Sequence, residues 1–84
     1  MSGLLAYGRM AEAHWREYCP RLVRDLEMRG RLQEALLEAQ ERTAADMDLL
    51  LWDLRKQGLD PQQAHDRAWE MIREKYILLP AEKR

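Results

Sequence analysis

The stretch from Arg31 to Gln57 constrains the fold most, because its 27 residues contain neither proline nor glycine. A helix of this length would be about 40 Å long at 1.5 Å per residue. A compact chain of 84 residues has a radius of gyration of only about 12 Å. We therefore expect either an elongated molecule or a long helix that meets a partner.

Within this stretch the apolar side chains follow a helical period. From Leu49 to Trp52 the segment is apolar on nearly every side. We therefore expect other helices to pack around its C-terminal half, whereas the N-terminal half, rich in glutamate and glutamine, should bury one side only. The stripe predicted to face the core comprises Leu32, Leu36, Ala39, Thr43, Met47, Leu50 and Leu54.

Proline and glycine mark the ends of the helices before this stretch. From Leu4 to Tyr18 the apolar residues again recur with a helical period, until Pro20 interrupts it. Proline removes a backbone donor, so the helix either kinks there or ends and restarts with Pro20 at its first position. Gly30 is predicted to close the following short segment in a left-handed conformation.

The last helix is predicted from a stop signal followed by a start signal. Gly58 follows the long helix, and Asp60 and Pro61 have the residue types preferred as N-cap and first helical residue. The helix should end before Pro80, and residues 81–84 should fray. Its predicted buried stripe comprises Ala64, Ala68, Ile72 and Tyr76.

Together these patterns predict an all-α protein, a small elongated helical bundle of three main helices with the first broken at Pro20. We expect one helical domain over residues 1–84, with helices at about 4–18, 20–29, 31–57 and 61–79.

The composition favours a soluble cytoplasmic protein. The net charge is −1, so no strong overall field attracts nucleic acid or anionic lipid. Cys19 is the one cysteine, which excludes an internal disulfide and a cysteine zinc site and fits a reducing compartment. The N-terminal residues lack the basic head and apolar run of a signal peptide, and the run from Leu49 to Trp52 is far too short to span a bilayer.

Few residues offer chemistry. The sequence has no glycine-rich phosphate loop, and the Glu-x-x-His pairs of carboxylate-bridged metal sites are missing. His14 and His65 fall on different predicted helices. Cys19 has two interpretations, a nucleophile at the start of a helix or a half-buried thiol, and we favour the second. We expect no enzyme activity, no cofactor and no metal.

Arginine gathers around Gly30, where two predicted helices meet. Such a cluster can bind a phosphate backbone. However, Arg21, Arg29 and Arg31 each follow an acid by one helical turn. We therefore favour a protein partner and keep a small DNA-binding regulator as the alternative. The predicted partner-binding residues are Arg21, Arg24, Arg29, Arg31, Glu34 and Glu38.

Three tryptophans also favour protein binding. Trp15, Trp52 and Trp69 are many indoles for so small a core, and tryptophan is enriched at interface hot spots. Two arrangements remain open: the three rings meet where the helices cross, or some of them form an interface. Self-association would satisfy the second arrangement as well as a foreign protein would.

Several short motifs resemble TnpV, a family of small proteins encoded in transposons and other mobile elements. They are Tyr7-Gly8-Arg9-Met10, then Glu17 with Pro20 and Leu22, then Gly30-Arg31-Leu32, and finally Tyr76-Ile77-Leu78. The connection around Gly58 to Gln63 is shorter than in that family. The resemblance implies a mobile-element accessory protein with one of two roles. It binds an element-encoded or host protein, for example as an inhibitor of a CRISPR-type defence nuclease, or it binds DNA as a small regulator. It carries over no catalytic residue.

Overall fold

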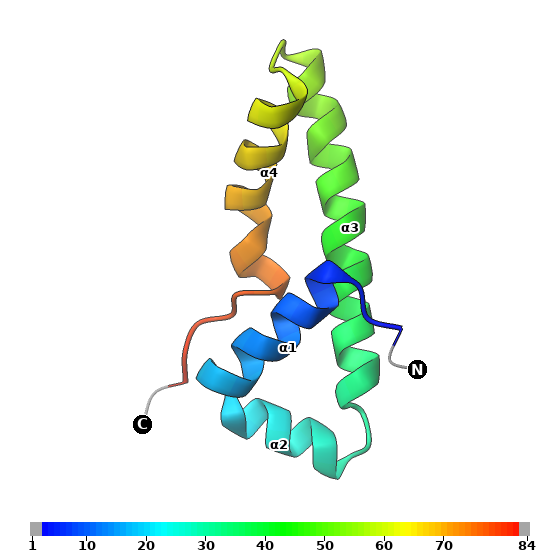
Figure 1. Ribbon diagram of the computed structural model, residues 1–84, viewed down its shortest axis with the longest axis vertical. Helices are drawn as coiled ribbons and strands as arrows, with labels where there is room; N and C mark the ends of the chain where they lie inside the picture. Colours follow the sequence, from blue (N-terminus) through cyan, green and yellow to red (C-terminus); the bar gives the residue numbers. More distant parts are fainter. Residues whose placement is uncertain (1–2, 83–84) are drawn as a thin grey trace.

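The protein is helical throughout its regular structure. The computed structural model describes residues 3–82, and within them it contains four α-helices and no strand. Figure 1 shows α3 as the longest element, with α4 returning beside it and α1 and α2 around its first half. The prediction of an all-α fold is confirmed. Pro20 separates two complete helices, so the described part has four helices. They are α1 (Ala6–Tyr18), α2 (Pro20–Met28), α3 (Leu32–Lys56) and α4 (Pro61–Tyr76).

The glycine, aspartate and proline residues predicted to end or begin helices do so in the structure. Gly30 and Gly58 have φ angles of 67° and 101°, which place both in the left-handed region that glycine tolerates. Asp60 caps α4: its carboxylate accepts from the amide of Gln63 at 2.9 Å, and the Gln63 side chain accepts from the Asp60 amide at 3.2 Å. Pro20 and Pro61 each begin a helix.

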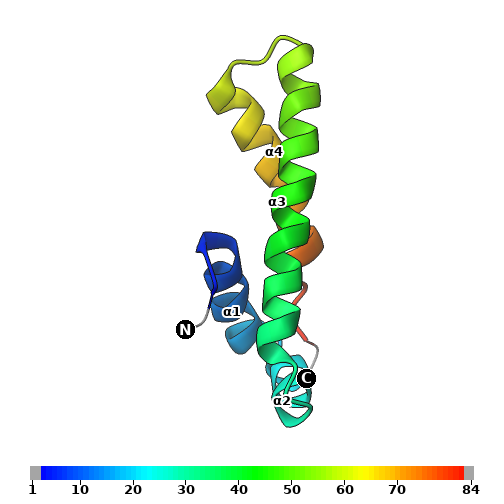
Figure 2. The same cartoon turned by 90° about the vertical axis from the view of Figure 1, so that its right-hand side faces the viewer.

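The molecule is long and thin. It measures 46 × 32 × 14 Å, and its radius of gyration is 14.4 Å. Figure 2, turned by 90°, shows α3 running along most of the length, with α1 against only one part of it. We call α1, α2 and the first half of α3 the base, and residues 46–57 of α3 with residues 61–72 of α4 the arm.

Two apolar clusters correspond to these two parts. The base cluster includes Trp15, Val23, Leu36 and Ile77, and the arm cluster includes residues from α3 and α4 alone. Tyr7 stacks on Trp69 with ring centroids 5.5 Å apart, and both rings contact both clusters. The predicted stripes on α3 and α4 supply most of the arm cluster, which comprises Met47, Leu54, Ala64, Ala68 and Ile72.

The prediction about the two halves of α3 is wrong. The first half is the enclosed one, since it contacts α1, α2 and the C-terminal segment, whereas the second half packs on α4. Leu49 and Trp52 are consequently exposed. The apolar run from Leu49 to Trp52 allows several sides of α3 to be buried there. Which sides are covered depends on how far the neighbouring helices extend along α3.

Residues 77–82 form a strap across α1 and the start of α2, and this corrects two further predictions. The last helix ends at Tyr76, three residues before the predicted end at Leu79. The Trp15 indole donates to the Ile77 carbonyl at 3.0 Å, and the Glu82 amide donates to the Tyr18 carbonyl at 2.8 Å. Residues 81–82 are thus held in place, and residues 83–84 of the predicted frayed tail lie outside the described residues.

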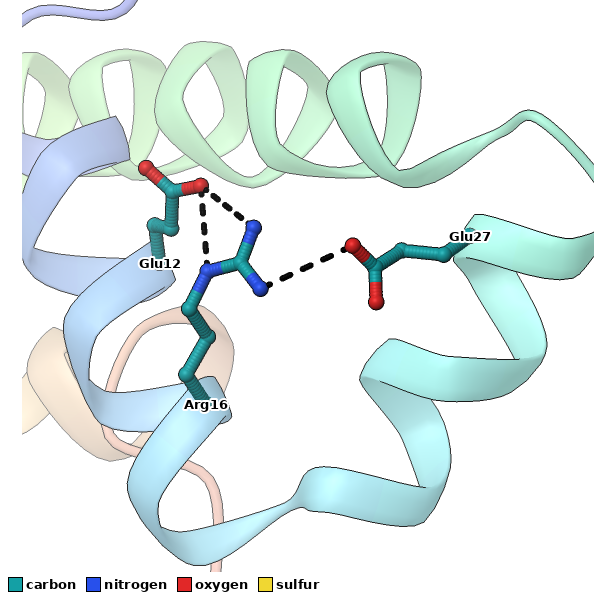
Figure 3. Close-up of polar contacts among 3 residues, drawn as sticks. All are labelled: Glu12, Arg16 and Glu27. Atoms are coloured by element: carbon teal, nitrogen blue, oxygen red, sulfur yellow. Dashed lines mark hydrogen bonds and ion pairs between the residues drawn. The ribbon is translucent and has the colours of Figure 1, made fainter.

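The strap also caps α2. The two carboxylate oxygens of Glu82 accept from the amides of Arg21 and Leu22 at 2.9 and 3.0 Å. These first-turn amides have no partner within the helix, so a carboxylate from elsewhere in the chain satisfies them. Figure 3 shows a further link between α1 and α2, where Arg16 contacts Glu12 at 3.0 Å and Glu27 at 3.6 Å.

Candidate functional site

The residues considered for chemistry are engaged in structural contacts. Cys19 is 4 % exposed, its Sγ lies 3.5 Å from the Pro80 carbonyl oxygen, and burial, aided by the charge of Glu82, raises the pKa of the thiol. The His14 Nε2 lies 2.8 Å from the carbonyl oxygen of Leu79. Among residues 3–82, no group of three His, Cys, Asp or Glu side chains is arranged to hold a metal ion.

We call the six predicted partner-binding residues the charged corner. Arg29 and Arg31 flank Gly30 at the α2–α3 junction, and Glu34 and Glu38 follow on the first turns of α3, whereas Arg21 lies at the opposite end of α2, where Glu82 caps it, and Arg24 lies one turn further along α2. Arg29 pairs with Asp25 at 3.3 Å, and Arg31 pairs with Glu34 at 3.3 Å. Glu38 pairs with Arg42, outside the set, at 2.7 Å. The two partners of each pair are exposed and lie within one helical turn of each other. Such pairs neutralise charge locally and add little to the stability of the fold. Within the described part of the chain, the Arg21 and Arg24 side chains form no ion pair.

The acids of the charged corner adjoin a surface hollow of about 620 Å³ that the arginines do not line. Glu34 and Glu38 line it with Glu41 from the next turn. The structure therefore brings the acids of the set together, and of the four arginines of the set only Arg31 forms an ion pair with one of them. The hollow is lined by Gly30, Gln33, Glu34, Leu37, Glu38 and Glu41.

The arm carries an apolar surface that the sequence reasoning missed. Leu49, Trp52 and Met71 are 72 %, 64 % and 59 % exposed, and they surround a groove of about 570 Å³ between α3 and α4. We call this surface the open face. The groove is lined by Asp46, Leu49, Leu50, Trp52, Asp53, Met71, Ile72 and Lys75.

The open face lies on the side of α3 away from α1. The Gln40 side chain accepts from the amides of Leu5 and Gly8, which fixes the side of α3 that faces α1. Leu49 follows Gln40 by nine residues, about two and a half turns, and therefore points to the opposite side. A second hollow, of about 260 Å³, continues along the same α3–α4 seam and shares Lys75 with the groove.

A polar cluster crosses the seam between these two hollows. Asp46 accepts from the Tyr76 hydroxyl at 2.8 Å and from the Lys75 ammonium at 3.1 Å. Both hydrogen bonds lower the pKa of Asp46, and the bond from Tyr76 has the larger effect. The hydrogen bond to Asp46 raises the pKa of Lys75. At the edge of the open face, the Lys56 ammonium lies 4.2 Å from the centre of the Trp52 ring. The open face is thus an apolar patch whose groove is lined by acids of α3 and a lysine of α4, with Lys56 of α3 at its edge.

The three tryptophans divide between core and surface. Trp15 is 5 % exposed and belongs to the base cluster, whereas Trp69 is half-buried against Tyr7. Trp52 lies on the open face. The sequence did contain a signal for this: since the buried stripe passes through Met47, Leu50 and Leu54, the helical period places Leu49 and Trp52 outside it.

Comparison with protein-family models, with curated proteins and with solved structures finds no match for this chain. No helix within residues 3–82 is both long enough and apolar enough to cross a bilayer. The fold and the surfaces described above are therefore the basis for assigning a function.

Proposed function

We propose that this protein acts without catalysis, by stoichiometric binding to protein. The observation that supports this is the open face. Leu49, Trp52 and Met71 expose large apolar side chains around one groove, on two helices that pack against each other. A clustered apolar patch that contains a tryptophan is typical of protein interfaces.

The contacts of the chemically interesting residues support the non-catalytic part of the proposal. A cysteine nucleophile requires a thiolate, but Cys19 is buried and its pKa is raised. His14 is engaged with a backbone carbonyl of the strap. Both side chains thus help to hold the strap against α1.

The resemblance to TnpV motivates a finer proposal. In it, the protein is a mobile-element accessory factor in the cytoplasm, and its target is a host or element protein such as a CRISPR-type nuclease. We assign the contact with this target to the charged corner, where Arg21 and Arg24 have the side chains most available for a new ion pair. The other four charges of the corner are already paired with neighbours, so we prefer a protein target to a phosphate backbone.

Affinity capture from a nuclease-treated bacterial lysate tests this function. The tagged wild type is compared with an open-face variant, Leu49→Gln/Trp52→Gln, and with a corner variant, Arg24→Glu/Arg31→Glu. Met28→Gln is the matched control for the open-face variant only, because Met28 is 82 % exposed and lies at the end of α2, away from the arm but next to the charged corner. Captured proteins are identified by mass spectrometry, and nucleic acid is measured in an untreated parallel sample.

We expect one abundant protein with the wild type and a clear loss with the corner variant. A loss with the open-face variant that Met28→Gln does not show would assign the contact with the captured protein to the open face as well. Equal capture by all four baits would refute the assignment of both surfaces. Enrichment of nucleic acid alone, weakened steeply by added salt, would replace the proposal with the small DNA-binding regulator.

A further inference from the structure

We infer that the open face is covered by a second copy of this chain, so that two arms form a four-helix bundle. This inference rests on the proposed function, because it names the protein that the open face binds. It follows from three properties of the arm: its single-layer packing, the arrangement of its charges and its area.

The arm is one layer of two helices, and this leaves it incompletely packed. The buried residues of the arm cluster come from α3 and α4 alone, and Figure 1 shows no third helix beside this part of the molecule among the described residues. Met47, Leu54 and Ile72 are buried between α3 and α4, but Leu49, Trp52 and Met71 on the outer side are not. An antiparallel helix pair with a remaining apolar side forms a four-helix bundle when it packs on an identical pair.

Two arms can pack face to face about a twofold axis in two simple ways, and the charges on the open face favour one of them. Among the charged residues that line the groove, the acids Asp46 and Asp53 come from α3 and Lys75 comes from α4. Arg67 lies on α4 one turn before Met71, outside the groove lining, and Lys56 of α3 lies over Trp52 at the edge. A twofold axis parallel to the helices would place α3 of each copy over α4 of its partner. A perpendicular axis in the plane of the interface would instead place α3 over α3, and acids over acids. Charge complementarity therefore favours the parallel axis.

The register of the hairpin makes this arrangement specific. Asp46 and Lys75 lie at the same height, since they form an ion pair across the hairpin at 3.1 Å. Two turns further along α3 and two turns back along α4, Asp53 and Arg67 lie at equal height. Rotation about an axis parallel to the helices preserves height. It therefore sets Asp53 against Arg67 of the partner subunit, and Leu49 against Met71 of the partner subunit.

The available area fits a weak but specific dimer. The groove of the open face reaches Lys75, so it faces at most residues 61–75 of α4, a length of about 22 Å, and two adjacent helices are about 20 Å wide. Each copy would thus contribute at most about 450 Å² and the pair about 900 Å², the size of a weak interface. We expect a dissociation constant in the micromolar range, about 1–100 μM.

Mass measurement across concentration tests the inference on the purified chain alone. Multi-angle light scattering or sedimentation equilibrium should show a mass rising from the 10.0 kDa of one chain toward twice that value. Leu49→Gln/Trp52→Gln should weaken association by roughly 30-fold or more. Met28→Gln should leave it unchanged. Circular dichroism should show the same helicity for all variants, because each altered side chain is exposed.

A charge exchange tests the proposed orientation. Asp53→Arg alone and Arg67→Asp alone should each weaken self-association, because each sets like charges together. An equimolar mixture of the two should form a heterodimer more readily than either variant forms a homodimer. Weakening without recovery in the mixture would overturn the parallel-axis arrangement.

The proposed protein-binding function and the proposed dimer can be refuted separately. A chain that stays monomeric at several hundred micromolar overturns the second copy as the occupant. If capture from lysate still depends on Leu49 and Trp52, the protein-binding function stands and the open face binds a foreign protein. A dimer that forms equally well in the Leu49→Gln/Trp52→Gln variant overturns the assignment of the dimer to the open face.

Discussion

Replacing Gly8 with alanine should destabilise the protein, although the same change usually stabilises a helix. Gly8 lies in the first turn of α1, where alanine is ordinarily better than glycine by about 0.5–1 kcal/mol. Here an added Cβ would lie 2.5 Å from the Gln40 Oε1 and 2.8 Å from the Leu4 Cδ2. No Cβ fits at these distances, so the Gln40 side chain must move.

Displacing Gln40 removes the cap of α1. Its Oε1 accepts from the amides of Leu5 and Gly8, and no side chain from α1 itself caps this end. A buried amide without an acceptor costs about 1–3 kcal/mol, and Leu5 is exposed enough for water to replace one bond. After the gain in helix propensity, we expect a net loss of about 1–2 kcal/mol. For a chain of this size that lowers Tm by roughly 5–15 °C.

A double-mutant cycle followed by urea and thermal unfolding tests this mechanism at one fixed protein concentration. Gln40→Ala should destabilise on its own, and in that background Gly8→Ala should cost less stability than in the wild type, because the clash with Oε1 is gone and only the close contact with the Leu4 side chain remains. Ala13→Gly, at an exposed position of α1, measures the helix propensity of that helix without any contact to Gln40. If Gly8→Ala stabilises the wild type, or if the two changes are simply additive, then Gln40 does not cap α1.

Three further predictions concern the strap and the polar cluster. Glu82→Ala should lower the free energy of unfolding by about 1–2 kcal/mol, because it removes the cap of α2. Glu41→Ala, at an exposed position of α3, should change the free energy of thermal unfolding by less than about 0.5 kcal/mol. Asp46 has a pKa below its ordinary 3.8. Its ionised form therefore stabilises the fold above that pH, and this contribution is lost as the pH falls through the lower pKa of the folded state. The difference in free energy of unfolding between the wild type and Asp46→Asn should shrink below about pH 4. Cys19 is buried with a raised pKa, so its alkylation should be at least about tenfold slower in the folded protein than in urea, and equal rates would contradict a closed strap.

The helices could be predicted from sequence because their ends are set by local chemistry. Proline at Pro20 and Pro61, and glycine at Gly30 and Gly58, act on their own backbone and need no distant partner. The capping box at Asp60 spans three residues. The apolar stripes likewise depend on the period of a single helix, which is why most of the buried positions on α3 and α4 were correct.

The strap and the cap of α1 could not be predicted, because their partners are distant in sequence. Gln40 accepts from Gly8 across 32 positions, and the Trp15 indole donates to Ile77 across 62. A lone glutamine in a helix and a short apolar tail have many satisfactory environments, and nothing local selects among them. The predicted binding residues were chosen for charge near a junction, whereas the exposed apolar groove depends on where α1 stops covering α3.

The contrast between the base and the arm is the strongest argument that the open face is functional. In the base, distant groups such as Gln40, Glu82 and the Ile77 carbonyl satisfy helix ends and an indole. The arm is joined to this base through α3, through the C-terminal end of α4 and through the stacking of Tyr7 on Trp69, and its own buried residues come from α3 and α4 alone. Leu49, Trp52 and Met71 contribute little to that packing, since more than half of each is exposed. Polar side chains are the usual choice at exposed positions that contribute little to packing, so the apolar ones here support the proposal that this face contacts a protein.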